Sequence, residues 1–141
     1  MAPGNTTTGA VLEAMVLPAL SKGGFTPKKG VNVGQRIGGG KHIVDVIAAD
    51  AKGTQILVSL KWQQVAGTAE QKVPFEIISL ADAIANSEGE YAKAYLVLGG
   101  SGWKLRNLYT TGGLDKYLHN VDSVTVMGLE EFVGLANQGR L

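Results

Sequence analysis

Residues 42–76 read H-I-V-D-V-I-A-A-D-A-K-G-T-Q-I-L-V-S-L-K-W-Q-Q-V-A-G-T-A-E-Q-K-V-P-F-E, and this stretch decides the fold. Side chains alternate from residue 43 to residue 48 with the period of a β-strand. Lys52-Gly53-Thr54 is a turn signal, and residues 55–63 alternate as a second strand. Pro74 suits the first turn of a helix. The stretch therefore predicts a strand, a turn, a second strand, a loop and the start of a helix.

Two charges lie within these otherwise apolar strands. Asp45 is on the first strand, and Lys61 is on the second, where it shares a face with Leu57, Ser59 and Gln63. A charge in an apolar strand is costly to bury unless a partner offsets it. The two residues therefore predict either a functional site or a buried ion pair that only fixes the strand register, since structural ion pairs imitate sites.

The spacing of these residues resembles a known nuclease motif. Asp45 is followed by thirteen residues, then by Ser59-Leu60-Lys61, and then by Gln63. This pattern resembles the core of the PD-(D/E)XK nuclease superfamily, which has an acid on one strand and acid-x-lysine on the next, often with a glutamine two residues later. The likeness covers roughly residues 13–131, and the run K-W-Q-Q-V-A-G-T-A-E-Q-K-V-P-F-E is similar to phage and restriction-type members.

The chain departs from the motif at two positions. Val44 stands where the motif has proline, which changes no chemistry, but Ser59 stands where it has Asp or Glu and so removes a metal ligand. Either the protein is a catalytically inactive relative, or another carboxylate substitutes. Some restriction enzymes of the superfamily have Ser-x-Lys and take the missing oxygen from an acid on the following helix. Glu76 fits that arrangement, and Glu70 is the alternative.

The resemblance implies a metal-dependent DNA endonuclease that uses Mg²⁺ or Mn²⁺. Hard divalent cations prefer oxygen ligands, and the implied ligands are Asp45, Glu76, the backbone carbonyl of Leu60 and Glu13. The implied catalytic residues are Asp45, Lys61, Gln63 and Glu76. The alternative function is a non-catalytic nucleic-acid-binding or assembly protein on a decayed nuclease fold.

Basic residues between glycines provide candidate contacts to DNA. Residues 26–40 form a glycine-rich segment that includes Arg36 and is followed by Lys41, and Val31, Val33 and Ile37 in it could form a short strand. The segment is either a phosphate-contacting loop or a solvated one. We assign candidate substrate contacts to Ser59, Glu70, Lys41, Arg36 and Lys104. Cleavage of both strands at a two-fold DNA site favours a homodimer or a higher homo-oligomer.

Composition bounds the remaining possibilities. The chain has 141 residues and a net charge of +1, so we expect one nuclease-like domain over residues 1–141, with a loose tail at residues 1–8. A DNA-binding protein of this charge needs a local basic groove. The absence of cysteine excludes disulfides and thiolate nucleophiles. No apolar run has transmembrane length, so we expect no membrane partner and a cytoplasmic location in a bacterial or phage-infected cell.

The whole chain reads as an α/β fold. Outside the central stretch, we expect helices from a cap among residues 5–8 to about residue 21, over residues 74–86, 104–109 and 129–137, and strands over residues 92–98 and 121–127. Helices interleaved with short apolar strands favour a layered α/β architecture. The order matches the α-β-β-β-α-β core of restriction-endonuclease-like proteins, with a small central mixed sheet flanked by helices.

Overall fold

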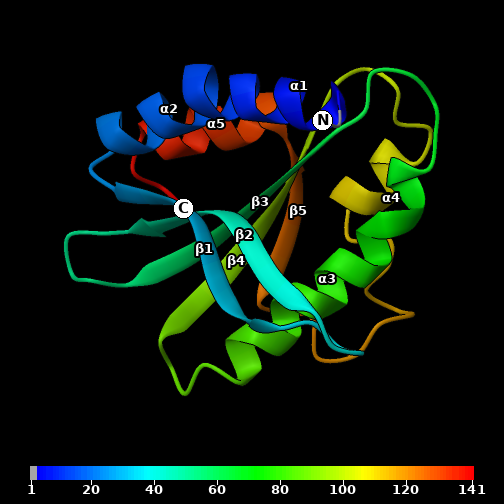
Figure 1. Cartoon of the computed structure of the whole chain (residues 1–141). Helices are drawn as coiled ribbons and strands as arrows, with labels where there is room; N and C mark the ends of the chain where they lie inside the picture. The colour runs from blue at the N-terminus through cyan, green and yellow to red at the C-terminus, as the bar shows by residue number, and fades with distance from the viewer. Residues whose placement is uncertain (1–2) are drawn as a thin grey trace.

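The computed structural model describes residues 3–141 and is built on one five-stranded mixed sheet (Figure 1). The strands lie in the order of the sequence: β1 (Thr26–Gln35), β2 (Lys41–Ala49), β3 (Gln55–Trp62), β4 (Tyr91–Gly99) and β5 (Val124–Gly128). The first three strands pair antiparallel, and β3, β4 and β5 pair parallel. The predicted α/β fold with a mixed sheet is therefore confirmed.

Helices cover both faces of this sheet. One layer contains α1 (Pro3–Val11), the π-helical turn η1 (Leu12–Val16), α2 (Leu17–Lys22) and α5 (Leu129–Asn137), and the other contains α3 (Ala69–Ala85) and α4 (Arg106–Thr110) (Figure 1). None of these helices is long and apolar enough to cross a lipid bilayer.

The central strand β3 shows why the sheet is covered on both sides. Ile56, Val58 and Leu60 pack into the core beneath α2 and α5, while Leu57 packs into the core beneath α3. The alternation predicted from the sequence is thus present, and each set of side chains has its own hydrophobic core. The polar residue Ser59 shares the α3 face with Leu57, so polar side chains on this strand point toward α3.

The N-terminal helix begins earlier than expected. A loose tail at residues 1–8 was predicted, but α1 starts at Pro3, a residue that suits the first turn of a helix; Met1 and Ala2 lie outside the described residues. Pro18 does not end the helical segment. The N–H of Leu17 donates to the carbonyl of Leu12 in a π-helical turn, and Pro18 then falls in the first turn of α2.

Helix α3 also begins earlier than expected, at Ala69, which places Pro74 inside the helix. A proline in a helix cannot donate to the carbonyl four residues before it, which here belongs to Glu70. The hydroxyl of Tyr109 donates to that carbonyl at 2.8 Å instead. This hydrogen bond from a distant part of the chain satisfies the carbonyl and allows the longer helix, a long-range compensation that local sequence patterns do not encode.

Candidate active site

A cavity of about 270 Å³ lies where β2, β3 and α3 approach one another. Arg36 from the loop after β1, Asp45 from β2, Lys61 from β3, and Lys72 and Glu76 from α3 supply its charged lining. Ser59, Leu60 and Thr8 also border it. Acids from two elements and cations from three therefore converge on a single cavity.

Asp45 lies at a break in the sheet. The paired residues of β2 and β3 run from Ala49 to Val46 and stop there, and the side chain of Asp45 accepts the N–H of Leu60 at 2.6 Å. The expected alternation also breaks at this point, because Val44 packs beneath α3 whereas Val46 packs on the opposite face. The carboxylate thus satisfies a strand N–H near the edge of the cavity.

The environment of Asp45 disfavours its charged form. Burial raises the pKa of this carboxyl above its usual value, and the nearby negative charge of Glu76 raises it further. The hydrogen bond from Leu60 and the positive charge of Lys61 lower the pKa but do not offset burial. A cation that binds in the cavity would therefore stabilise the ionised form of the Asp45 carboxyl group.

Glu76 is the most enclosed acid of the cavity, with a side chain only 5% exposed. Its Oε1 lies 2.6 Å from the Arg36 guanidinium, and its Oε2 accepts the hydroxyl of Ser59 at 3.0 Å. Burial raises the pKa of Glu76, but interactions with His42, Arg36 and Lys61 lower it more, to about 2. Glu76 is therefore ionised at neutral pH despite its burial.

Ser59 explains how the departure from the motif is accommodated locally. Its hydroxyl occupies the strand position expected for an acid and donates to the carboxylate that comes from α3. Ser59 and Glu76 are both buried, so this hydrogen bond fixes the carboxylate against β3. The structure thus brings Ser59, Glu76 and Asp45 to the same cavity.

His42 lies on β2 behind Glu76. Its ring is fully buried, and its Nε2 is 3.6 Å from Oε2 of Glu76, longer than an ordinary hydrogen bond. Neither ring nitrogen has a hydrogen-bond partner within the described residues. The imidazole therefore forms part of the wall behind the carboxylate rather than part of the cavity lining.

Gln63 and Glu70 do not lie at the cavity, in contrast to the roles predicted for them. Gln63 donates from Nε2 to Oε1 of Glu70 at 3.1 Å and to the carbonyl of Gly102 at 2.8 Å. Glu70 accepts the backbone N–H groups of Lys104 and Leu105, each at 2.8 Å. These bonds, the one from Lys104 foremost, lower the pKa of Glu70 although burial opposes them.

The physical reason for this correction is the loop after β4. Gly100 has φ of +90° and lies so close to Gln63 that a Cβ would overlap the Gln63 carbonyl, so the loop folds directly over the end of β3. The indole N–H of Trp103 donates to the carbonyl of Gly99 at 2.7 Å and fixes the same loop. Gln63 and Glu70 therefore anchor this loop to β3 and α3.

Three further predicted residues lie outside the cavity lining. Glu13 is 57% exposed and forms an ion pair with Lys29, because Leu12 and Val16 take the buried side of its helical turn. Lys41 and Lys104 are exposed and do not line the cavity. Of the predicted ligands and substrate contacts, the cavity therefore gathers Asp45, Glu76, Leu60, Ser59 and Arg36.

Lys72 was missed by the sequence analysis. It is exposed and lines the cavity one helical turn before Glu76. The signal was present in the spacing, since residues four apart share one face of a helix. A helix that begins only at Pro74 leaves Lys72 in the preceding loop, so the sequence pattern does not relate Lys72 to Glu76.

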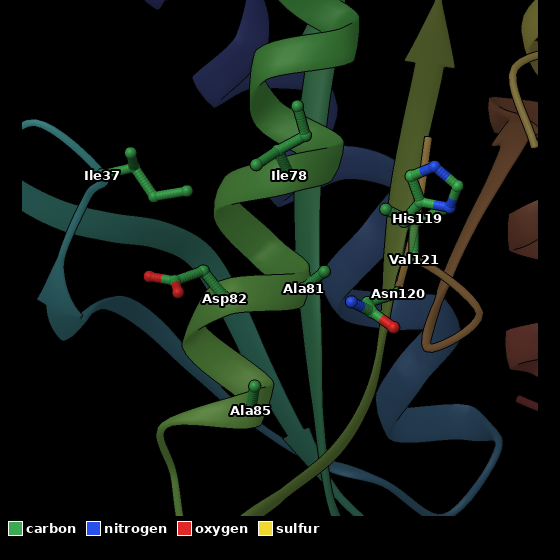
Figure 2. A pocket seen from close by; sticks show the side chains of 8 residues that line it. All are labelled: Ile37, Ile78, Ala81, Asp82, Ala85, His119, Asn120 and Val121. Atoms are coloured by element: carbon green, nitrogen blue, oxygen red, sulfur yellow. The ribbon is translucent and has the colours of Figure 1, made fainter. Parts of the chain in front are cut away.

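A second cavity of about 240 Å³ lies along α3 and is mainly apolar (Figure 2). Ile37 reaches toward α3 from the loop between β1 and β2, and His119 borders the cavity from the far side of the helix. The cavity contains none of the acids gathered around Ser59. Among residues 3–141, no three His, Cys, Asp or Glu side chains form a group that could hold a metal ion by themselves.

Comparison with known proteins identifies one matching family. A family model described as a PD-(D/E)XK nuclease superfamily domain matches residues 4–140. A crystal structure of a protein of unknown function, AF1548, is similar with a TM-score of 0.49 and 14% identity, covering 80% of this chain and 54% of that chain. A repair endonuclease from Pyrococcus abyssi is similar with a TM-score of 0.46 and 19% identity, and the match covers 92% of this chain and 47% of that chain. This chain thus spans about half the length of either protein, and no curated protein matches it.

Proposed function

The chain belongs to the PD-(D/E)XK nuclease superfamily, and from this premise we propose that it is a metal-dependent endodeoxyribonuclease of the Ser-x-Lys type. The observation that carries the proposal is the single cavity lined by Asp45, Lys61 and Glu76, with Ser59 bonded to Glu76. We treat residues 1–141 as one nuclease domain and assign it to the phage and restriction-type branch of the superfamily.

The donor set of the cavity suits Mg²⁺ or Mn²⁺. Mg²⁺ commonly binds through one or two carboxylates and completes its shell with waters and substrate phosphate oxygens, so a third acid is not required. Asp45 and Glu76 would hold the ion, with the carbonyl of Leu60 as a further oxygen donor. A bound divalent cation supplies charge stabilisation at a phosphate oxygen and lowers the pKa of an attacking water.

The other residues of the cavity have roles consistent with this chemistry. Lys61 projects from β3 beside both acids, and its charge lowers the pKa of each. An ammonium group in this position offsets negative charge that develops on a phosphate during hydrolysis. Ser59 orients the Glu76 carboxylate, and Lys72 and Arg36 are placed to contact the DNA backbone at the mouth of the cavity.

We propose DNA as the substrate and a homodimer or larger homo-oligomer as the working form. Cleavage of both strands needs two active sites, and two-fold symmetric assembly of a small domain provides them. The basic residues around the cavity give the local positive surface that a chain of net charge +1 requires for this purpose.

The test is cleavage of plasmid and branched DNA with Mg²⁺, with Mn²⁺ and with a chelator. We expect cleavage only with a divalent cation, and its loss in Asp45→Asn and Lys61→Ala, both of which should fold. Glu130→Gln is the matched control, because Glu130 is an exposed acid away from the cavity. Wild-type rates in both cavity variants would refute the site assignment.

The second candidate is a non-catalytic DNA-binding or assembly protein. The specific observation in its favour is that Arg36 already neutralises the charge of Glu76. In addition, Ser59 stands at the position where the motif has Asp or Glu. Binding of the same DNA in a gel-shift assay, with no cleavage under any metal condition, would favour this function over the nuclease.

A further inference from the structure

The Glu76 carboxylate is already bonded to a cation that belongs to the protein. The Arg36 guanidinium lies 2.6 Å from Oε1, while Ser59 donates to Oε2. A carboxylate held this closely by a guanidinium has its charge neutralised by a short, charge-assisted hydrogen bond. A divalent cation approaching Oε1 would meet the positive charge of Arg36 at the same atom.

The two partners of this ion pair differ in how firmly they are held. Glu76 lies within the long helix α3, is 5% exposed, and is fixed by Ser59 from β3. Arg36 is 27% exposed and lies in the loop between β1 and β2. If the pair separates, the arginine can move into water, whereas the carboxylate stays in the cavity.

The loop that carries Arg36 is closed by backbone hydrogen bonds between its own residues. It closes through Arg36 N–H to the Gly40 carbonyl and Gly39 N–H to the Arg36 carbonyl, each at 2.9 Å. The next residue, Ile37, is 49% exposed and borders the second cavity beside α3 (Figure 2). Of the cavity's three cationic side chains, Arg36 is therefore the one carried by a loop, since Lys61 lies on β3 and Lys72 on α3.

We infer that Arg36 is an internal counter-cation that competes with the divalent metal for Glu76 and is displaced when the metal binds. This inference rests on the proposed function, because it concerns the same carboxylates. The displaced guanidinium finds a new anionic partner in a DNA phosphate, which accepts two parallel hydrogen bonds from arginine. Metal and DNA thus act together. The metal becomes the new partner of Glu76, and the DNA phosphate becomes the new partner of Arg36.

Removing Arg36 changes metal affinity in opposite directions if Arg36 competes with the metal and if it only supports Glu76. If Arg36 competes with the metal, its removal leaves a buried carboxylate with less compensating positive charge, which attracts a divalent cation more strongly. If Arg36 only positions Glu76, its removal weakens metal binding or leaves it unchanged. The direction of the change in metal affinity therefore separates the two roles without any measurement of activity.

The experiment is titration of the whole chain with Mn²⁺ alone, without DNA, followed by the electron paramagnetic resonance signal of free Mn²⁺. We expect Arg36→Gln to bind Mn²⁺ at least about ten-fold more tightly than the wild type, since a lost charge-assisted bond corresponds to a ten-fold change or more. Lys52→Gln is the control, because Lys52 is an exposed cation in the turn between β2 and β3. It should bind Mn²⁺ as the wild type does.

A second measurement avoids substitution in the protein that is titrated. The Arg36 side-chain Nε–H resonance of the wild type, assigned by its absence from Arg36→Gln, should shift when Mg²⁺ is added. A resonance unmoved at saturating Mg²⁺, or equal or weaker Mn²⁺ binding by Arg36→Gln, would overturn the inference. Wild-type cleavage of DNA together with either result would leave the nuclease function standing. Tighter Mn²⁺ binding by Arg36→Gln without any cleavage would support the competition and count against the nuclease.

Discussion

Replacing Glu76 by glutamine should lower the stability of the protein at neutral pH. The pKa of Glu76 lies at about 2 instead of 4.5, so folding favours its ionised form. That difference corresponds to at most about 3 kcal/mol of stability at pH 7, because the contact with His42 at 3.6 Å is weaker than a hydrogen bond. The glutamine has a similar shape but no charge, so Glu76→Gln should unfold up to about 3 kcal/mol more easily than the wild type.

The effect has a defined pH window. Because the folded pKa is below the unfolded one, the contribution of Glu76 is fully present above 4.5 and is lost as the pH falls through about 2. The difference between wild type and Glu76→Gln should shrink to about 1 kcal/mol at pH 3 and to a few tenths near pH 2. Urea denaturation followed by circular dichroism at pH 7, 4.5 and 3 measures it.

Asp45→Asn is the matched control and should change stability in the opposite direction. Burial raises the pKa of Asp45, so its contribution to stability is present below its unfolded value of 3.8 and is lost as the pH rises through the folded pKa. The neutral asparagine should therefore stabilise the protein at pH 7 and have no effect at low pH. Equal losses for Glu76→Gln at pH 7 and pH 3 would refute this account of the charges.

Glu76→Gln should also strongly reduce DNA cleavage, because it removes a proposed metal ligand. The double change Ser59→Glu with Glu76→Ser should restore part of that cleavage, because the acid returns to β3; activity no higher than that of the single variant would contradict the relocation. Gly100→Ala should destabilise by at least about 2 kcal/mol, since its φ of +90° and the Gln63 carbonyl leave no room for a Cβ. An unchanged melting temperature would be incompatible with that packing. Light scattering of the wild type should give at least twice the mass of one chain, and a monomer would remove the proposed assembly.

The local pattern was sufficient to predict the central strands. The alternation in β3 separated Ile56 from Leu57 correctly because a strand buried on both faces must divide its side chains between two cores. The carboxylate expected from the next helix also lies at the cavity, because Glu76 and Ser59 are brought together by the short connection from β3 to α3. Predictions that depended on neighbouring elements were therefore the reliable ones.

The structure departs from the expectations that depended on distant contacts. The motif places Gln63 at the site, with Glu70 as the alternative acid, but the loop after β4, some forty residues later, provides their partners. The start of α3 was misplaced because the hydroxyl that satisfies the helix at Pro74 comes from Tyr109. No local pattern indicates which remote group will satisfy a given carbonyl or carboxylate.

Strand β1 has consequences for how copies of this protein can meet. It lies at the border of the sheet, with β2 as its neighbour on one side only within the described residues. An open border ten residues long is a template on which another chain can add a strand and begin to aggregate. Pro27 has no backbone N–H to donate to an added strand. The exposed positive charge of Lys28 repels the same residue of a second copy that pairs along β1. We therefore expect the proposed dimer to form through a surface other than this border, which keeps the border from joining further copies.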